Sequence, residues 1–155
     1  MEKQEKNFIV PMSGLLLPLE DVPDSTFSDK SLGEGFAIEL SGDVVVSPFS
    51  GIVIAAFPSG HAFIIRRDDG LEVLIHIGLN SMKNSAAFKA NIDKYQRVKQ
   101  GDILTYVDKS RFPATQGALI SPLVFANPNL KLTLNKAKQN VLVGDESAVS
   151  LELPA

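Results

Sequence analysis

The chain contains two histidines, His61 and His76, and both lie in the segment GHAFIIRRDDGLEVLIHIG, residues 60–78. Each histidine stands in a short apolar run, and the pair Asp69-Gly70 between the runs is typical of a hairpin turn. A neutral imidazole near pH 7 can attack an electrophile through one ring nitrogen and donate a hydrogen bond from the other. Two imidazoles held together therefore suit phosphoryl transfer through a phosphohistidine, or they contribute to a metal site.

The turn chemistry predicts how the two histidines are placed. A two-residue turn at the Asp-Gly pair puts Arg67 opposite Glu72, a favourable charge pair, and Phe63 opposite His76. His61, Phe63 and His76 then share one face of the hairpin, with the histidines about 7 Å apart at the backbone. A four-residue loop gives the same pairing, whereas a three-residue loop would place the histidines on opposite faces.

The residues alone leave three interpretations of this pair open. In the first, one ring attacks phosphorus and the other donates to the phosphoryl oxygens, inside an apolar rim that limits hydrolysis. In the second, the rings bind a metal, although zinc sites use three or four ligands, so a zinc ion at His61 and His76 would be adventitious and completed by a partner's carboxylate. In the third, both histidines pack structurally in strands. The Ser59 hydroxyl either bonds the His61 ring or only caps the turn.

The sequence pattern predicts that the segments that position the two histidines are β-strands. Gly and Pro punctuate many short runs rich in Val, Ile, Leu and Phe, which predicts an all-β sandwich or barrel. A turn or two of helix is expected only within residues 80–91. The length fits a single domain over residues 8–155, preceded by a mobile polar tail over residues 1–7.

Three further segments have a simple expected structure. Pro11–Gly14 and Pro48–Gly51 both read Pro-x-Ser-Gly between apolar runs, which indicates either two independent turns or a structural duplication. The charged segment RRDDG is expected to be a solvated hairpin tip. The segment NLKLTLNKAKQN is expected to be an edge strand whose lysines discourage aggregation.

Composition excludes several classes of function. A net charge of -3 argues against a binder of nucleic acid or of anionic membranes. The absence of cysteine removes disulfides, thiolate nucleophiles and cysteine-based zinc sites. No run approaches the roughly 20 apolar residues of a membrane span, and the first residues lack the pattern of a secretory signal. A cytoplasmic location without direct membrane insertion is the expectation.

At the level of motifs, PFSGIVIAAFPSGHAF and GLEVLIHIGLNSM resemble the glucose-type IIA domain of the bacterial phosphoenolpyruvate:sugar phosphotransferase system. The family pattern is a Pro-x-x-Gly turn, a strand, Thr/Ser-x-His-Ala-Phe, an acidic-Gly turn and His-x-Gly. The resemblance covers about residues 8–153. The matching positions are Pro48, Gly51, Ser59, His61-Ala62-Phe63, Asp69-Gly70 and His76-Ile77-Gly78, with further matches over 11–38, 97–104 and 120–127.

This resemblance implies an antiparallel β-sandwich with a duplicated hybrid motif and a role for each site residue. His76 would be the phosphorylated nucleophile, with its Nδ1 held by a backbone carbonyl near Gly78. His61 would stabilise the phosphoryl group, and Ser59 would orient the His61 ring. The transfer needs no metal or organic cofactor. Phosphate would come from the histidine-containing phosphocarrier protein and leave to a cysteine on a IIB domain of a sugar permease. An apolar collar for these partners would comprise Phe36, Phe57, Phe63 and Leu74.

The sequence departs from the family pattern at the positions expected to contact partners. Glu34 replaces the usual aspartate of Gly-Asp-Gly, and Asn80-Ser81-Met82 replaces an aspartate followed by Thr-Val. The carboxylate missing at Asn80 is one expected to meet an arginine of the phosphocarrier, so donor recognition is expected to differ. Partner contacts are thus assigned to Glu34, Asn80 and Met82 as well. These changes leave a second function open, that of a non-catalytic IIA-like regulator with its own binding targets.

Overall fold

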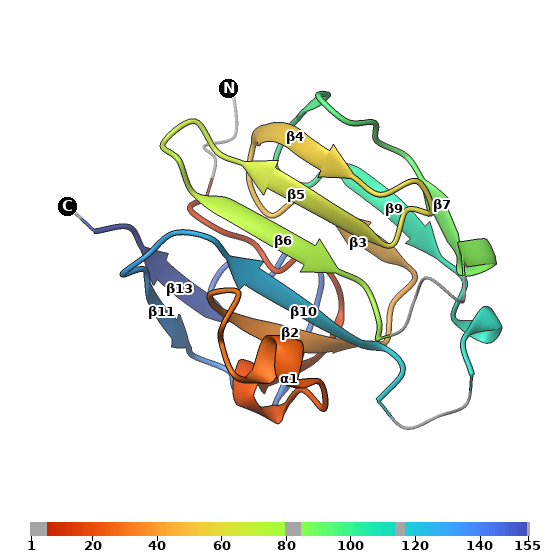
Figure 1. The fold of residues 1–155 in the computed structure, drawn as a ribbon, viewed down its shortest axis with the longest axis horizontal. Coiled ribbons are helices and arrows are strands. Elements are labelled where there is room, and N and C mark those ends of the chain that lie inside the picture. The colour runs from red at the N-terminus through yellow and green to blue at the C-terminus, as the bar shows by residue number, and fades with distance from the viewer. Residues whose placement is uncertain (1–5, 80–84, 114–116, 155) are drawn as a thin grey trace.

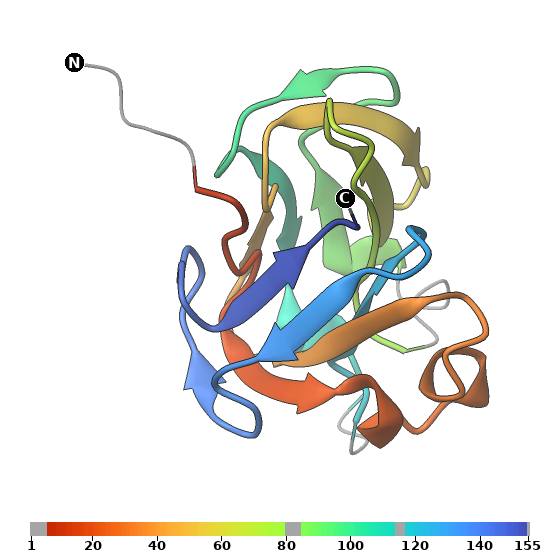
Figure 2. The same cartoon turned by 90° about the vertical axis from the view of Figure 1, so that its left-hand side faces the viewer.

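The short apolar runs form antiparallel strands in the computed structural model, which describes residues 6–79, 85–113 and 117–154. Two views of the ribbon show strands wrapped around one interior, with few helical turns (Figures 1 and 2). The strands are β1 (Gly14–Pro18), β2 (Glu34–Leu40), β3 (Val44–Val46), β4 (Gly51–Ala56), β5 (Ala62–Arg66), β6 (Glu72–His76), β7 (Phe88–Ala90), β8 (Arg97–Val98), β9 (Ile103–Val107), β10 (Ile120–Phe125), β11 (Lys131–Leu134), β12 (Asn140–Val141) and β13 (Val149–Glu152). The labelled helical turns are η1 (Leu19–Asp21), α1 (Ser25–Ser28) and η3 (Lys109–Arg111), and residues 85–87 form a further 3₁₀ turn.

The strands belong to three antiparallel sheets. The largest has the order β12-β1-β2-β10-β6-β5-β4-β8, and the smaller ones have the orders β3-β9-β7 and β11-β13. The predicted all-β sandwich is therefore confirmed, and so is an edge position for the lysine-bearing strand β11, which among the described residues pairs with β13 only. Among the described residues, no helix has the length and apolar character that crossing a bilayer requires.

Two local expectations differ from the structure. In the segment expected to hold a helix, residues 85–87 form one 3₁₀ turn, but Phe88–Ala90 is strand β7, while residues 80–84 lie outside the described residues. The apolar residues 8–10 are buried without becoming a strand, since Phe8 is 3% exposed and Val10 is fully buried. An apolar run therefore predicts that a segment is buried more reliably than it predicts that the segment pairs as a strand.

The core follows the alternation of side chains along the strands. Alternate residues Phe36, Ile38 and Leu40 of β2 point into the main hydrophobic cluster, which extends along the chain from Phe8 to Leu151. On the other face of β2, Ala37 packs in a smaller cluster that includes the side chains of η1 and α1. The α1 segment thus covers the outer face of β2 and β10, whereas β4, β5 and β6 keep an open outer face (Figure 1).

The two Pro-x-Ser-Gly turns form a reciprocal pair. The amide of Val46 donates to the carbonyl of Pro11 at 2.8 Å, and the amide of Ile9 donates to the carbonyl of Pro48 at 3.1 Å. Each proline carbonyl thus accepts from the residue two positions before the other proline. Two independent turns have no reason to adopt this symmetry, so the hydrogen bonds indicate a structural duplication.

Strand pairing extends the duplication. Gly14 begins β1 opposite Val141 of β12, and Gly51 begins β4 opposite Val98 of β8. A Cβ at either glycine would lie about 2 Å from a carbonyl oxygen of the next strand, of Glu39 in β2 or of Arg66 in β5. Both turns therefore need glycine for the same close approach of backbones, and the duplicated motif is confirmed.

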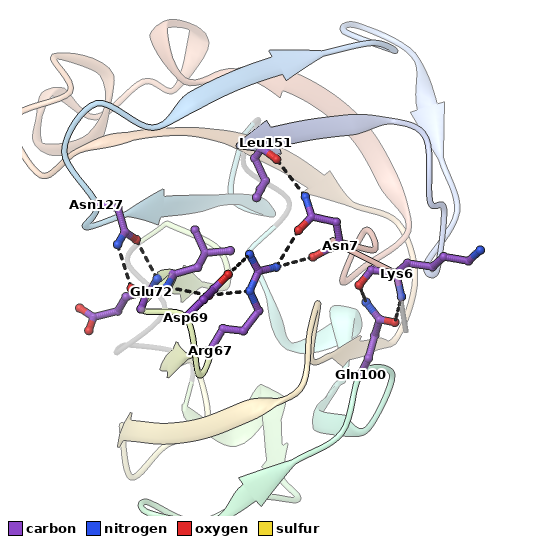
Figure 3. Close-up of polar contacts among 10 residues, drawn as sticks. Lys6, Asn7, Arg67, Asp69, Glu72, Gln100, Asn127 and Leu151 are labelled. Atoms are coloured by element: carbon purple, nitrogen blue, oxygen red, sulfur yellow. Dashed lines mark hydrogen bonds and ion pairs between the residues drawn. The ribbon is translucent and has the colours of Figure 1, made fainter. Parts of the chain in front are cut away.

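The tip of the β5–β6 hairpin is less solvated than the charge run RRDDG suggests. The guanidinium of Arg67 donates to the backbone and side-chain oxygens of Asn7 at 2.7 and 2.9 Å, and it forms an ion pair with Asp69 at 2.7 Å (Figure 3). The amide of Asn7 in turn donates to the carbonyl of Leu151. Asp68 and Asp69 are exposed as expected, but Arg67, with 18% of its side chain exposed, joins the hairpin to Asn7, whose side-chain amide contacts Leu151.

The amino-terminal tail is accordingly shorter than predicted. Lys6 exchanges two hydrogen bonds with Gln100, and Asn7 makes the contacts just described. Both residues are thus held against the folded part of the chain, contrary to the expectation of a mobile tail over residues 1–7. Residues 1–5 lie outside the described residues.

Replacing Arg67 with alanine should lower the free energy of unfolding by about 1–3 kcal/mol, because the two oxygens of Asn7 lose the charged donor that holds them against the hairpin. The matched control is Arg66→Ala, next in sequence, whose side chain is 53% exposed and forms one ion pair with Glu72. That control should cost less than about 1 kcal/mol. Urea unfolding of both variants measures the difference, and equal losses would contradict the proposed anchoring by Arg67.

Candidate functional site

His76 is the last residue of β6 and lies opposite Ala62 of β5. Its ring is half-buried, and Nδ1 lies 2.9 Å from the carbonyl oxygen of Gly78. A carbonyl oxygen can only accept a hydrogen bond, so Nδ1 must carry the proton that fills this contact. The neutral ring then keeps its free lone pair on Nε2, which makes Nε2 the nucleophilic atom.

His61 precedes β5 in a tight bend and is 5% exposed. The bend depends on Gly60, whose φ is +81° and whose Cβ, if it had one, would lie 3.1 Å from the Cβ of Ala90. Glycine is therefore required both by conformation and by space. The expected contact of the Ser59 hydroxyl with Nδ1 of His61 is present. The rings of His61 and His76 meet edge to face, with their centroids 5.4 Å apart.

The two rings meet through a register that differs from the predicted one. Arg66, and not Arg67, lies opposite Glu72, and His76 lies opposite Ala62 instead of Phe63. The loop has three residues, because the amide of Arg67 donates to the carbonyl of Leu71. In a regular strand this loop would place the histidines on opposite faces, as the sequence argument states.

The bend at His61 resolves this conflict. His61 lies outside β5, and its carbonyl accepts the amide of Ile77 at 2.8 Å, so its backbone still pairs across the hairpin. The left-handed conformation of Gly60 breaks the alternation of side chains just before the strand begins. The histidine pair is therefore correct, but the register argument that led to it is wrong.

Aromatic rings surround the pair. Phe57 lies 5.5 Å and Phe88 6.2 Å from His61, and Phe27 of α1 lies 5.6 Å from His76, all between ring centroids. A cavity of about 520 Å³ opens beside the rings. The described residues that line it are Phe57, Pro58, Ser59, His61 and His76. Both imidazoles thus share one apolar-walled hollow that a partner's group can enter.

The expected apolar collar is correct in part. Phe36 is fully buried and Phe63 is 1% exposed, and both belong to the main core. Their assignment to a docking collar is wrong, because alternation along β2 and β5 turns these side chains inward. Phe57, with 39% exposure, and half-buried Leu74 do face outward.

Cross-strand pairing defines the surface next to the histidines. Leu74 lies opposite Ile64, and Ile64 lies opposite Ala55, so three half-buried apolar side chains line up across β6, β5 and β4. We call Ala55, Phe57, Ile64 and Leu74 the outer patch. Sequence reasoning missed Ile64 because the predicted register of the hairpin assigned the wrong face, and it made no prediction for the pairing of β4, which contains Ala55.

The remaining predicted partner contacts are not brought into this surface. Glu34 is half-buried and forms an ion pair with Lys30 at 3.2 Å, and its carboxylate also accepts the amide of Gly35. Asn80 and Met82 lie outside the described residues. Sequence reasoning also missed Phe27, whose helix α1 begins with an Asp24 side chain that accepts the amide of Thr26. The segment VPDST carries this N-cap signal.

Burial keeps both histidines neutral near pH 7. Burial lowers the pKa of His76 below 6.5, against smaller opposing effects of the Gly78 carbonyl and the Asp24 carboxylate. Burial also lowers the pKa of His61, and the nearby His76 lowers it further. Because burial disfavours charge on both rings, the pair suits a reaction that begins with a neutral nucleophile.

The arrangement offers little to a catalytic metal. The described residues contain no cluster of three or more His, Cys, Asp or Glu side chains that could hold an ion. Zinc sites use at least three protein ligands, and the two imidazoles supply two of them. The described residues therefore do not favour a catalytic metal site, and adventitious zinc at His61 and His76 stays a prediction.

The lowered pKa values predict a pH-dependent stability. Below pH 6.5 the unfolded chain binds protons at both histidines before the folded chain does, so the free energy of unfolding should fall from about pH 7.5 to about pH 5. The double variant His61→Gln, His76→Gln should lose much of this dependence. Urea unfolding at both pH values checks it. An identical pH dependence in the variant would show that the histidines do not cause it.

The structure is similar to the glucose permease IIA from Mycoplasma capricolum, with a TM-score of 0.79, 33% identity, and coverage of 95% of this chain and 96% of that chain. The sequence is 39% identical over 124 residues to the glucosamine-specific EIICBA component of the phosphotransferase system of Bacillus subtilis (strain 168). That match covers 79% of this chain and 20% of the relative, so this chain spans about a fifth of the relative's length.

A family model agrees with these two similarities. The model of the phosphoenolpyruvate-dependent sugar phosphotransferase system, EIIA 1, matches residues 6–130, which include the whole histidine hairpin. The chain therefore belongs to the EIIA 1 family, and it is a phosphocarrier component of a sugar uptake system that transfers phosphoryl groups through histidine.

Proposed function

We propose that His76 is the histidine that carries the phosphoryl group. The observation that supports this choice is the contact of its Nδ1 with the Gly78 carbonyl, which leaves the lone pair on Nε2. In the transfer, this lone pair forms a bond to phosphorus while the phosphorus–nitrogen bond of the donor phosphohistidine breaks. The electron pair of the broken bond returns to the donor's ring. No oxidant, reductant or metal takes part in this exchange.

His61 is proposed to stabilise the phosphoryl oxygens. When the Ser59 hydroxyl donates to Nδ1 of His61, the ring proton stands on Nε2 and is available to a phosphoryl oxygen. The edge-to-face contact of the two rings supports this role, because it brings His61 next to the atom that would carry the phosphate. A fixed donor beside the developing charge lowers the barrier without reorganisation.

Family membership implies two protein partners, the histidine-containing phosphocarrier protein as donor and a IIB component as acceptor. We infer that both dock on the outer patch, because its apolar side chains adjoin the cavity that both histidines line. This docking accounts for half-exposed apolar side chains on an open sheet face. The exchange would take place in the cytoplasm, where the family's phosphoryl donors act.

The sugar and the extent of the functional unit are further proposals. One relative is named for glucosamine and the other is a glucose permease, so a hexose of this type is the substrate class that we infer for the uptake system. We also propose that residues 8–155 work as one IIA unit. A single core that extends from Phe8 to Leu151 supports this view.

Single substitutions should separate the roles of the two histidines. With phosphoenolpyruvate, enzyme I and the phosphocarrier protein present, the natural chain should gain the mass of one phosphoryl group. His76→Ala should abolish this gain, because the nucleophile is lost. His61→Ala should still accept phosphate but pass it to a IIB component at least about 100-fold more slowly, since a donor to the phosphoryl oxygens is lost. Intact mass spectrometry measures both steps.

The control is phosphorylation of the carrier protein itself, checked in the same sample. A phosphoryl gain that survives in His76→Ala and disappears in His61→Ala would reverse the assigned roles. No gain in the natural chain beside a phosphorylated carrier would instead favour the regulatory function.

The outer patch yields a separate prediction. Ile64→Glu should weaken the productive encounter with the phosphorylated carrier by about tenfold or more, because a charge would be buried in an apolar interface. The control is Leu142→Glu, at a leucine that is 75% exposed in the turn after β12. Rates of phosphoryl acceptance at several carrier concentrations measure the effect. If both variants accept phosphate at the rate of the natural chain, docking on this patch is excluded.

A further inference from the structure

Gly78 must adopt a special conformation in order to face His76. Its φ is +75°, and a Cβ at this position would lie 2.7 Å from the ring of Phe112. The segment therefore depends on contacts that hold a glycine backbone in the left-handed region. These contacts fix the position of the Gly78 carbonyl, which is the acceptor of the His76 Nδ1 proton.

The amides of two consecutive residues, Gly78 and Leu79, form hydrogen bonds to residues 118–121. The Gly78 amide donates to Oγ of Ser121 at 3.0 Å, and the Leu79 amide donates to the carbonyl of Ala118 at 3.1 Å. The second of these peptide groups also contains the Gly78 carbonyl that accepts from His76. Strand β10 and the turn before it thus supply an acceptor to each of these two peptide groups.

Of these two acceptors, the Ser121 hydroxyl belongs to a side chain, whereas the Ala118 carbonyl belongs to the backbone. It is fully buried in β10, and its hydroxyl donates to the carbonyl of Leu119 at 3.0 Å. Because this donation uses the hydroxyl proton, the oxygen presents its lone pairs to Gly78. The direction of the Ser121–Gly78 hydrogen bond is therefore fixed by a second contact, and it can only run from the amide to the serine.

We propose that Ser121 is a positioning residue that selects the tautomer of His76 through Gly78. The inference deepens the proposed role of His76 as phosphoryl acceptor and rests on it. Without the hydroxyl, the hydrogen bond from the buried Gly78 amide to Ser121 is lost and the segment relaxes. The Gly78 carbonyl then holds Nδ1–H less firmly, and a larger share of His76 carries its proton on Nε2, where it blocks attack on phosphorus.

The first readout is the tautomer itself. Long-range nitrogen–proton NMR correlation at about pH 7.5 separates the two neutral tautomers of each histidine ring. We expect the natural chain to show the Nδ1–H form at His76, and Ser121→Ala to show a mixture. Ser121→Thr, which keeps the hydroxyl, should restore the natural spectrum. Ser121→Cys keeps the volume with a weak acceptor and should resemble the alanine variant, which covers the case that Ser121→Ala does not fold.

The second readout is the rate of phosphoryl acceptance from the phosphorylated carrier. Loss of a residue that orients a reacting group commonly costs ten- to a hundredfold, so we expect Ser121→Ala and Ser121→Cys to be about tenfold slower. The matched control is Ser47→Ala, at a fully buried serine after β3 whose hydroxyl donates to the carbonyl of Phe49 at 2.7 Å. Ser47→Ala should leave the His76 tautomer and the rate unchanged.

The two readouts keep the inference distinct from the proposed function. An unchanged His76 tautomer in Ser121→Ala and Ser121→Cys overturns the role of Ser121, whatever the rates are. A shift of the same size in Ser47→Ala also overturns it, because the effect would then be general loosening. If the natural chain takes up no phosphate on His76, the proposed function fails, and the NMR spectra still decide whether Ser121 controls the ring.

Discussion

Strands β6 and β10 pair antiparallel at the centre of the large sheet, with Leu123 opposite Ile75 and Phe125 opposite Val73. On one side of this pairing lie β5, β4 and β8, and on the other lie β2, β1 and β12. The pairing thus joins two halves that each contain a Pro-x-Ser-Gly turn. It also places the start of β10 beside the residues that follow β6, which is where the His76 ring finds its backbone acceptor.

The two halves share a scaffold and differ in one connection. The hydroxyl of Ser13 accepts the amide of Val143, and the hydroxyl of Ser50 accepts the amide of Gln100, so equivalent turns are held in equivalent ways. Between β4 and β5 the connection is the short bend that carries His61. Between β1 and β2 it is longer and includes α1, whose Phe27 ring packs near His76. Duplication supplies a rigid frame, and the unequal connections make a site on one side only.

Local chemistry in the sequence accounts for most of the fold and for the membership of the site. Apolar runs between turn residues predicted nearly every strand that positions the histidines, because burial and turn conformation are local properties. The sheet face to which each side chain points was harder to predict. A hairpin loop longer or shorter by one residue moves every side chain of a strand to the opposite face. Phe63 was therefore assigned to the surface and Ile64 overlooked. Ser121 could not be found at all, because its role arises from a contact with Gly78 across the sheet.

The chemical difference between two identical side chains follows from their partners. Both rings are kept neutral by burial. A backbone carbonyl at Nδ1 of His76 can only accept, so that ring must expose a lone pair at Nε2. A hydroxyl at Nδ1 of His61 can donate, so that ring can expose a proton at Nε2 instead. A nucleophile and a hydrogen-bond donor are thus obtained from one residue type, and the choice of a carbonyl or a hydroxyl neighbour assigns the roles.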